Sequence, residues 1–284
     1  MSYRRKHIKP KIKRLKRRKK LIKRPWFWIV LAVLVISGIL FYFMLFFSKF
    51  QVKNIEISGN EKINKGDIED LTWLNINKKL LNNGLINIST KSIFIVNSKK
   101  VIKGILAEFP AIEEVKLQKK LPRNIVLKIR ERQPFSAFCS DYVGNARSSI
   151  NQDQITEECF VLDINGVIFD ELQSIPQNMT VIKEKLNGKA FLGQNIIEKN
   201  IIGIIYNVEK NLKDNFQIGV KEVLISDPLI FKTSENWEIY FDPKSDINLQ
   251  ITKMNILLKD EIPESVRKNM QYIYLQYKDR AYYK

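Results

Sequence analysis

Residues 50–60 read Phe-Gln-Val-Lys-Asn-Ile-Glu-Ile-Ser-Gly-Asn, and they predict how the folded part of the chain begins. Apolar and polar side chains alternate toward Ile57, which is typical of a half-buried strand. Ser58, Gly59 and Asn60 are turn residues and end the pattern. The stretch therefore predicts the first strand of a domain, followed by a tight turn.

Two helices and a hairpin are predicted downstream of this strand. Apolar side chains recur at helical spacing over residues 65–74, and a polar loop is expected around residues 81–84. Asn97 or Ser98 can cap a second helix that Phe109-Pro110 stops. Residues 112–117 and 125–129 then form two strands around a turn that contains proline. The predicted order is β-α-α-β-β.

Upstream of the first strand, residues 26–47 form an apolar run without a formal charge. As a helix this run would span about 33 Å, which is enough for a hydrocarbon core of about 30 Å. The alternative is a cleaved signal peptide, but the run is longer than an ordinary signal-peptide core and no small-x-small site follows it. The pattern favours a single uncleaved transmembrane helix.

The charge of the chain is concentrated in front of this helix. The formal net charge is +18, with 48 basic and 30 acidic residues, and residues 1–24 hold 14 of the basic ones and no acidic one. By the positive-inside rule, residues 1–25 are a cytoplasmic tail and residues from about 48 onward lie outside the cytoplasm. The tail is expected to attract anionic lipid, and an acidic partner is the alternative. No nucleic acid is expected, because residues 4–24 lack aromatic stacking residues.

A second domain with strands and interspersed helices is predicted from Pro134 onward. Residues 159–169 predict a hairpin with a type I′ turn at Asn165-Gly166. A helix is expected near residues 196–212, strands at 220–226, 229–233 and 237–241, and another helix at 246–258. That last helix is expected to turn three side chains inward, namely Leu249, Met254 and Leu257.

Residues 271–284 are rich in tyrosine and are predicted to contain the last strand. Alternation predicts that Ile273, Leu275 and Tyr277 face one side of it. Tyr272, Tyr274 and Gln276 would then face the other side. Tyrosine and arginine are frequent anchors of protein interfaces, which favours a binding role for this strand. The alternative is that Tyr272 and Tyr274 pack on a neighbouring helix.

Catalytic chemistry finds little support in the sequence. The only histidine is His7 in the basic tail, so no Ser-His or Cys-His pair is expected beyond the membrane helix. No metal-ligand spacing, phosphate loop or cofactor motif is present, and the Ser-x-x-Lys of residues 265–268 is interpreted as chance. We expect no enzyme activity, no catalytic residues, no metal and no cofactor.

Cys139 and Cys159 flank a polar segment of 19 residues. Both are expected outside the cytoplasm, where disulfides persist. A disulfide closing this loop would contribute about 3 kcal/mol in the loop-entropy model. Two buried free thiols are the alternative.

The motifs at 50–60, Phe109-Pro110-Ala111-Ile112, Lys119-Lys120-Leu121-Pro122 and residues 125–134 resemble a POTRA domain. A basic tail, one membrane span and one adjacent POTRA domain together resemble the FtsQ/DivIB family of bacterial cell-division proteins. The resemblance implies an α+β architecture with four parts: tail 1–25, transmembrane helix 26–47, POTRA domain 50–133 and a mixed, mainly antiparallel β domain 134–284. One departure is that Tyr274 and Gln276 replace the acidic and basic residues of the family pattern.

The same resemblance implies a non-enzymatic scaffold at the division septum, anchored in the cell membrane. Implied partners are the coiled-coil proteins FtsB (DivIC) and FtsL and, through them, the septal peptidoglycan synthase. In the family the partner adds to the edge of the β domain near its last strand. On that analogy the contact residues are Tyr272, Tyr274, Gln276, Tyr277, Arg280 and Tyr282. The alternative function is a membrane-anchored factor for protein transport or envelope assembly, because POTRA domains also occur there.

Overall fold

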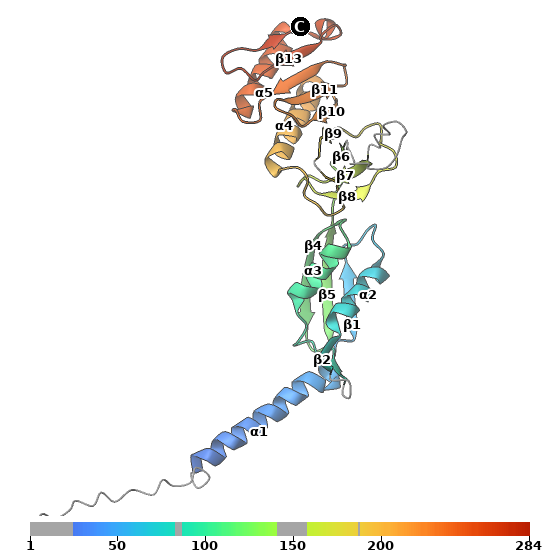
Figure 1. Cartoon of the computed structure of the whole chain (residues 1–284), viewed down its shortest axis with the longest axis vertical. Helices are drawn as coiled ribbons and strands as arrows, with labels where there is room; N and C mark the ends of the chain where they lie inside the picture. The colour runs from blue at the N-terminus through green and yellow to red at the C-terminus, as the bar shows by residue number, and fades with distance from the viewer. Residues whose placement is uncertain (1–24, 83–86, 141–157, 187) are drawn as a thin grey trace, which may run out of the picture. The chain divides into compact units, whose positions relative to one another are not determined.

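The structure, a computed structural model, describes residues 25–82, 87–140, 158–186 and 188–284 (Figure 1). The basic tail therefore lies outside the described residues. The chain divides into two compact units. The first comprises Met1–Asn54, Asn77–Val96 and Lys119–Asn124, and the second comprises Ile55–Ile76, Asn97–Gln118 and Ile125–Lys284.

The first unit contains helix α1 (Pro25–Phe46), which has 22 residues and a mean hydropathy of 2.8 over its most apolar stretch. This is long and apolar enough to cross a membrane, and Leu45 is its one buried residue. The predicted transmembrane helix at 26–47 thus corresponds to an observed helix shifted by a single residue. A short 3₁₀ turn, Ser48–Phe50, follows it.

The last carbonyl groups of α1 are satisfied by side chains from elsewhere in the first unit. Met44 O accepts a hydrogen bond from Ser92 Oγ at 2.8 Å. Leu45 O accepts from Thr90 Oγ1 at 2.7 Å and from Gln51 Nε2 at 2.6 Å. A helix leaves its final carbonyls without helical partners, so these three side chains cap α1. Strands β2 (Lys78–Asn82) and β3 (Asn87–Thr90) form an antiparallel pair where the sequence predicted only a loop around 81–84.

The N-terminal part of the second unit is built on a three-stranded sheet with strand order β1-β5-β4. The strands are β1 (Asn54–Ser58), β4 (Ile112–Lys120) and β5 (Asn124–Glu131). Helix α2 (Lys65–Ile76) packs on α3 (Ser98–Glu108). Asn97 caps α3 through a hydrogen bond from Lys100 N, as predicted. The strands and helices predicted for this region are present, with the β2–β3 pair inserted between α2 and α3.

The turn after β1 shows why Gly59 occurs in the motif at 50–60 and Glu131 in the motif at 125–134. Gly59 has φ +86°, and a Cβ atom there would lie 2.1 Å from the carbonyl oxygen of Ile129. Directly beyond it, the carboxylate of Glu131 accepts hydrogen bonds from the backbone N–H groups of residues 61, 62 and 63 at 2.8–3.1 Å. Glu131 is only 8% exposed. Burial alone would raise the pKa of Glu131, but these backbone hydrogen bonds, with help from the charge of Lys62, lower it instead.

Replacing Glu131 by glutamine is expected to destabilise the fold by about 2 kcal/mol at neutral pH, because an amide presents a single acceptor oxygen to three donors. A carboxyl group whose pKa is lowered by folding stabilises the protein above its unfolded pKa of about 4.3. That contribution is lost as pH falls through the folded value. The difference between wild type and E131Q should therefore shrink below about pH 4. Urea titrations across pH measure this, and a difference that stays constant with pH would contradict it. The exposed Glu108→Gln variant, which makes the same change at the end of α3, is the control.

The remainder of the second unit is a mixed nine-stranded sheet with the order β14-β13-β12-β11-β10-β9-β6-β7-β8. Five neighbouring pairs are antiparallel and three are parallel, which confirms the prediction of a mixed, mainly antiparallel sheet. The strands are β6 (Ser136–Ser140), β7 (Glu158–Leu162), β8 (Ile168–Glu171), β9 (Val181–Glu184), β10 (Val220–Leu224), β11 (Leu229–Thr233), β12 (Glu238–Phe241), β13 (Tyr272–Tyr274) and β14 (Tyr282–Tyr283).

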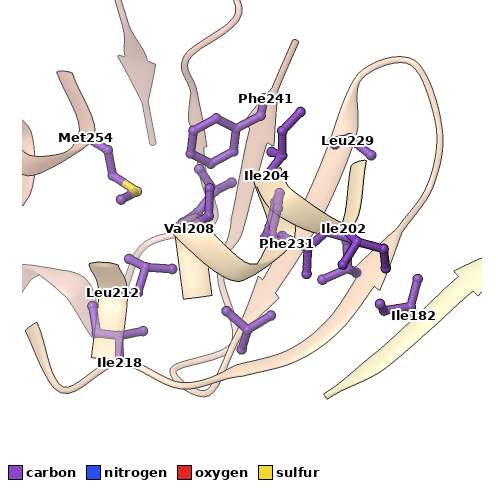
Figure 2. Packing of buried hydrophobic residues seen from close by; sticks show 14 of the residues in the cluster. Ile182, Ile202, Ile204, Val208, Leu212, Ile218, Leu229, Phe231, Phe241 and Met254 are labelled. Carbon is purple, nitrogen blue, oxygen red and sulfur yellow. The ribbon is translucent and has the colours of Figure 1, made fainter. Parts of the chain in front are cut away.

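Helix α4 (Lys199–Phe216) forms the centre of the core against this sheet. Figure 2 shows Ile202, Val208 and Leu212 of α4 among side chains of the strands. The rings of Phe231 and Phe241 in the same core pack edge-to-face, with their centroids 5.3 Å apart. Helix α5 (Ile247–Ile256), the π-helical turn Leu257–Glu261 and the short α6 (Glu264–Arg267) follow β12.

One inward position on α5 was predicted wrongly. Met254 is fully buried and Leu257 is half-buried, but Leu249 is 43% exposed. Gln250 is buried in its place. Its amide donates to Asp242 O and accepts from Asp242 N, both at 2.9 Å. A buried glutamine is stable at this position because both ends of its amide are paired.

The hairpin β7–β8 forms as predicted, but its turn is not of type I′. Gly166 has φ +80°, whereas Asn165 does not have the positive φ that a type I′ turn requires. Gly166 N donates to Asp163 O, and Asp163 N donates to Val167 O. The Asp163 carboxylate explains the difference, since it accepts from the backbone N–H groups of both Asn165 and Val167 at 2.9 Å and holds a longer turn.

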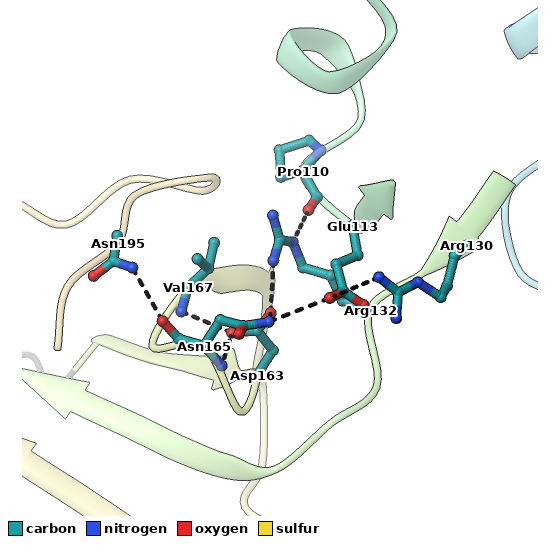
Figure 3. A network of polar contacts seen from close by, with 8 residues as sticks. All are labelled: Pro110, Glu113, Arg130, Arg132, Asp163, Asn165, Val167 and Asn195. Carbon is teal, nitrogen blue, oxygen red and sulfur yellow. Dashed lines mark hydrogen bonds and ion pairs between the residues drawn. The ribbon is translucent and has the colours of Figure 1, made fainter. Parts of the chain in front are cut away.

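Asp163 also forms an ion pair with the residue that follows β5. Arg132 Nη1 lies 2.6 Å from Asp163 Oδ2, and the side chains are 15% and 2% exposed (Figure 3). Arg132 Nε donates to Pro110 O at 2.9 Å. Asn165 Nδ2 reaches Glu113 Oε1 at 3.3 Å, and Glu113 pairs with the exposed Arg130. This network joins β4 and β5 to the β7–β8 turn inside the second unit.

Candidate partner-binding site

The tyrosine-rich segment predicted to bind a partner starts as strand β13, beside β12. β13 runs parallel to β12 with Ile239 opposite Ile273. Leu275 N donates to Tyr240 O at 3.0 Å, so the pairing continues past the last residue assigned to the strand. Ile273 and Leu275 are fully buried and belong to the core with α4 and α5. The prediction that these two residues share one side of the strand is confirmed, and that side faces the core.

Tyr272 and Tyr274 point to the opposite face of the sheet from that core. They are half-buried, and their ring centroids are 4.7 Å apart. The ring of Tyr274 also lies 4.3 Å from that of Tyr240 on β12. Tyr272 and Tyr274 thus contact each other along β13, and Tyr274 contacts Tyr240 on the neighbouring strand. We call Tyr240, Tyr272 and Tyr274 the tyrosine cluster.

The tyrosine cluster is fixed at one end by a carboxylate. Tyr240 OH donates to Glu238 Oε2 at 2.5 Å. This hydrogen bond, together with partial burial, raises the pKa of Tyr240 well above its usual value. The hydrogen bond to Glu238 holds the phenol in one orientation, which gives the neighbouring rings a fixed surface to pack on.

The chain leaves the sheet after Leu275, earlier than the predicted strand does. Lys253 Nζ of α5 donates to Leu275 O at 3.0 Å and to Tyr277 O at 2.5 Å. Burial lowers the pKa of Lys253, while Asp279 acts in the opposite direction. Because the carbonyl groups turn toward this lysine, Tyr277 does not join Ile273 and Leu275 in the core and is 47% exposed. The prediction that Tyr277 shares one side of the strand with Ile273 and Leu275 is therefore wrong.

A shallow groove lies beside this loop. Its volume is about 330 Å³, and it is lined by α5 residues, including the exposed Leu249 and the half-buried Lys253, and by residues 275–278. Gln276 is half-buried and Arg280 is exposed. The predicted contact residues thus divide between a strand, a loop and a second strand.

That second strand, β14, was missed in the sequence analysis. Tyr282 and Tyr283 pair antiparallel with β13, with Tyr274 opposite Tyr282. Arg280 Nη1 lies 3.3 Å from Tyr282 OH, and the ring of Tyr277 packs edge-to-face on that of Tyr282 at 5.4 Å. The signal in the sequence is short, because only two aromatic residues follow the polar stretch 278–280. This strand forms because it pairs with β13, and its own sequence is too short to predict it.

The two cysteines lie directly opposite each other at another place in the same sheet. Cys139 on β6 is the register partner of Cys159 on β7, and the structure joins them by a disulfide. The predicted loop between them is shorter than expected, since Ser140 and Glu158 belong to the strands. Residues 141–157 lie outside the described residues.

The sequence of the chain is similar to that of known cell-division proteins. No protein-family model matches the chain. Two curated proteins named cell division protein DivIB, from Clostridium botulinum strains Hall and Loch Maree, are each 28% identical to the chain over 169 residues. The match covers 60% of this chain and 53% of each relative, so it spans about half the length of those proteins.

Proposed function

We propose that the protein is a non-enzymatic, membrane-anchored scaffold of the bacterial division machinery, and its similarity to two proteins named cell division protein DivIB supports this proposal. Helix α1 would be the anchor, with the basic tail in the cytoplasm and the residues from about 48 onward outside it. Residues 50–133 would act as a POTRA domain and residues 134–284 as the β domain. The proposed place of action is the septum.

The proposed partners are FtsB/DivIC-like and FtsL-like coiled-coil proteins. Through them the scaffold would influence the septal peptidoglycan synthase. The observation that supports this proposal most directly is the end of the nine-stranded sheet, where the tyrosine cluster lies on β12 and β13, next to β14. A sheet edge binds an extended segment through backbone hydrogen bonds, and neighbouring side chains supply specificity. Tyrosine rings contribute large contact area at small cost in conformational entropy.

Co-purification of the full chain with the DivIC-like and FtsL-like proteins of the same organism tests this proposal. We expect recovery from the wild type and a drop of about ten-fold, or about 1.4 kcal/mol in binding, for Tyr274→Ala. Tyr206→Ala is the matched control, since Tyr206 is a 43% exposed tyrosine of α4. Deleting residues 271–284 should abolish recovery because it removes β13 itself.

Two outcomes would count against the division scaffold. Failure of the wild type to recover either coiled-coil protein would overturn it, and so would undiminished recovery with Tyr274→Ala. The alternative of a transport or envelope-assembly factor predicts a different result, in which unfolded envelope proteins bind and the coiled-coil proteins do not.

A further inference from the structure

The edge of β13 that faces away from β12 is occupied by the chain itself. Gln271 N and Tyr272 N donate to Lys284 O at 2.6 and 3.3 Å, and Lys284 N donates to Tyr272 O at 3.2 Å. Tyr272 and Lys284 therefore exchange hydrogen bonds in both directions, as residues of an antiparallel ladder do. A partner that adds a strand next to β13 would need these same backbone groups.

Residues 282–284 are held mainly by these backbone bonds. Tyr282 and Tyr283 are 46% and 43% exposed, whereas Ile273, which lies opposite Tyr283, is fully buried. The side-chain contacts of the segment are the edge-to-face contact with Tyr277, the hydrogen bond from Arg280 and a 3.5 Å approach of Tyr283 OH to Glu261. A short strand with so little buried apolar surface opens more readily than the core strands.

We propose that residues 282–284 form a replaceable strand, which fills the binding edge of β13 until an extended segment of a partner takes its place. This inference deepens the proposed function and rests on it for the identity of the partner. The incoming segment would run antiparallel to β13. An aromatic residue opposite Tyr274 would repeat the contact that Tyr282 makes with Tyr277.

Addition of a partner onto β14 is the competing arrangement, and the structure favours it less. Lys284 N points toward β13, so alternation along the strand places Tyr282 N on the same side and Tyr283 N on the outward side. The outward edge of β14 thus offers the groups of a single residue, Tyr283. The edge of β13 offers those of Gln271, Tyr272 and Tyr274 and lies next to the tyrosine cluster.

A peptide with the sequence of residues 278–284 tests the replaceable strand without any partner protein. The labelled peptide is titrated against the full chain in detergent and against a chain shortened to residue 281, and fluorescence anisotropy is recorded. We expect the shortened chain to bind the peptide about ten-fold or more tightly than the intact chain, whose edge is already filled. Hydrogen exchange at Tyr272 and Tyr274 should also be faster in the shortened chain.

Two variant peptides check the register. Tyr282→Pro removes an inward N–H and should lose about ten-fold in affinity for the shortened chain, whereas Tyr283→Pro removes an outward N–H and should bind nearly as the unchanged peptide does. Equal binding to intact and shortened chains, or no binding to the shortened chain, would overturn the inference. Equal losses for the two proline peptides would overturn it as well.

The DivIC-like protein separates this inference from the proposed function. It should bind the shortened chain more tightly than the intact chain and displace the peptide. Weaker binding to the shortened chain would show that β14 is part of the docking surface and would overturn the replaceable strand, with the division scaffold retained. If the DivIC-like protein binds neither chain, the proposed function fails, and the peptide titration still decides whether the strand is replaceable.

Discussion

Replacing Arg132 by methionine is expected to lower the free energy of unfolding by about 3 kcal/mol. The Asp163 carboxylate is 2% exposed and lies 2.6 Å from the Arg132 guanidinium. Removing the cation leaves a buried charge that, among the residues described by the structure, accepts hydrogen bonds from Asn165 and Val167 alone. An unpaired buried charge is costly because water no longer solvates it.

Arg130→Met provides the matched control. Arg130 lies two residues earlier in the chain and pairs with Glu113 and Glu114 at 3.3 and 3.2 Å, but its side chain is 61% exposed. An exposed pair is worth less than about 1 kcal/mol, because water and salt screen the charges. Urea titration of each full-length variant in detergent, followed by tryptophan fluorescence, measures the difference. Equal losses for the two methionine variants would show that burial does not govern this ion pair.

The Arg132–Asp163 pair also shows the limit of what the sequence could predict. The motif at residues 125–134, which contains Arg132, and the β7–β8 hairpin, which contains Asp163, were each recognised in the sequence. Neither local pattern indicates that Arg132 and Asp163 meet. Glu131 turns back to residues 61–63, while Arg132 turns forward to Asp163. Such pairings depend on how separate elements pack, which apolar periodicity does not encode.

Where periodicity is strong, the sequence predicted the elements well. Alternation at 229–233 matches β11 residue for residue, and the recurrent isoleucines ahead of Leu212 correspond to α4 and the turn before it. The errors occur where a polar side chain overrides the pattern. Gln250 replaces Leu249 in the core by pairing with Asp242, and Lys253 draws the chain out of the sheet at Tyr277.

The candidate site was predicted in composition but not in arrangement. Alternation correctly separated Tyr272 and Tyr274 from Ile273, so the face that carries the tyrosine cluster followed from the sequence. Tyr282 was expected on the same strand, and the structure places it on the neighbouring strand β14 instead. The polar loop between the two strands gives no periodic signal, because its shape depends on the contact with Lys253.

The second large effect is expected at the turn between β7 and β8, where Gly166→Ala should destabilise the protein by about 3 kcal/mol or more. Gly166 has φ +80°, a conformation that L residues rarely adopt, and an added Cβ would lie 2.1 Å from the carbonyl oxygen of Ile197. The backbone segments at Gly166 and Ile197 cannot easily move away from each other. Ile197 is 2% exposed and sits in the core, and Ile196 N donates to Gly166 O at 2.8 Å.

Gly203→Ala distinguishes this clash from a general effect of adding a methyl group. Gly203 lies within α4, and a Cβ there would meet no atom within 4 Å. In a helix interior the change from glycine to alanine stabilises by about 0.5–1 kcal/mol. The two alanine variants should therefore shift the urea midpoint in opposite directions. If Gly166→Ala unfolds at the wild-type midpoint, the turn does not have the positive φ described here, and the hydrogen bonds that hold Asp163 toward Arg132 would need a different backbone path.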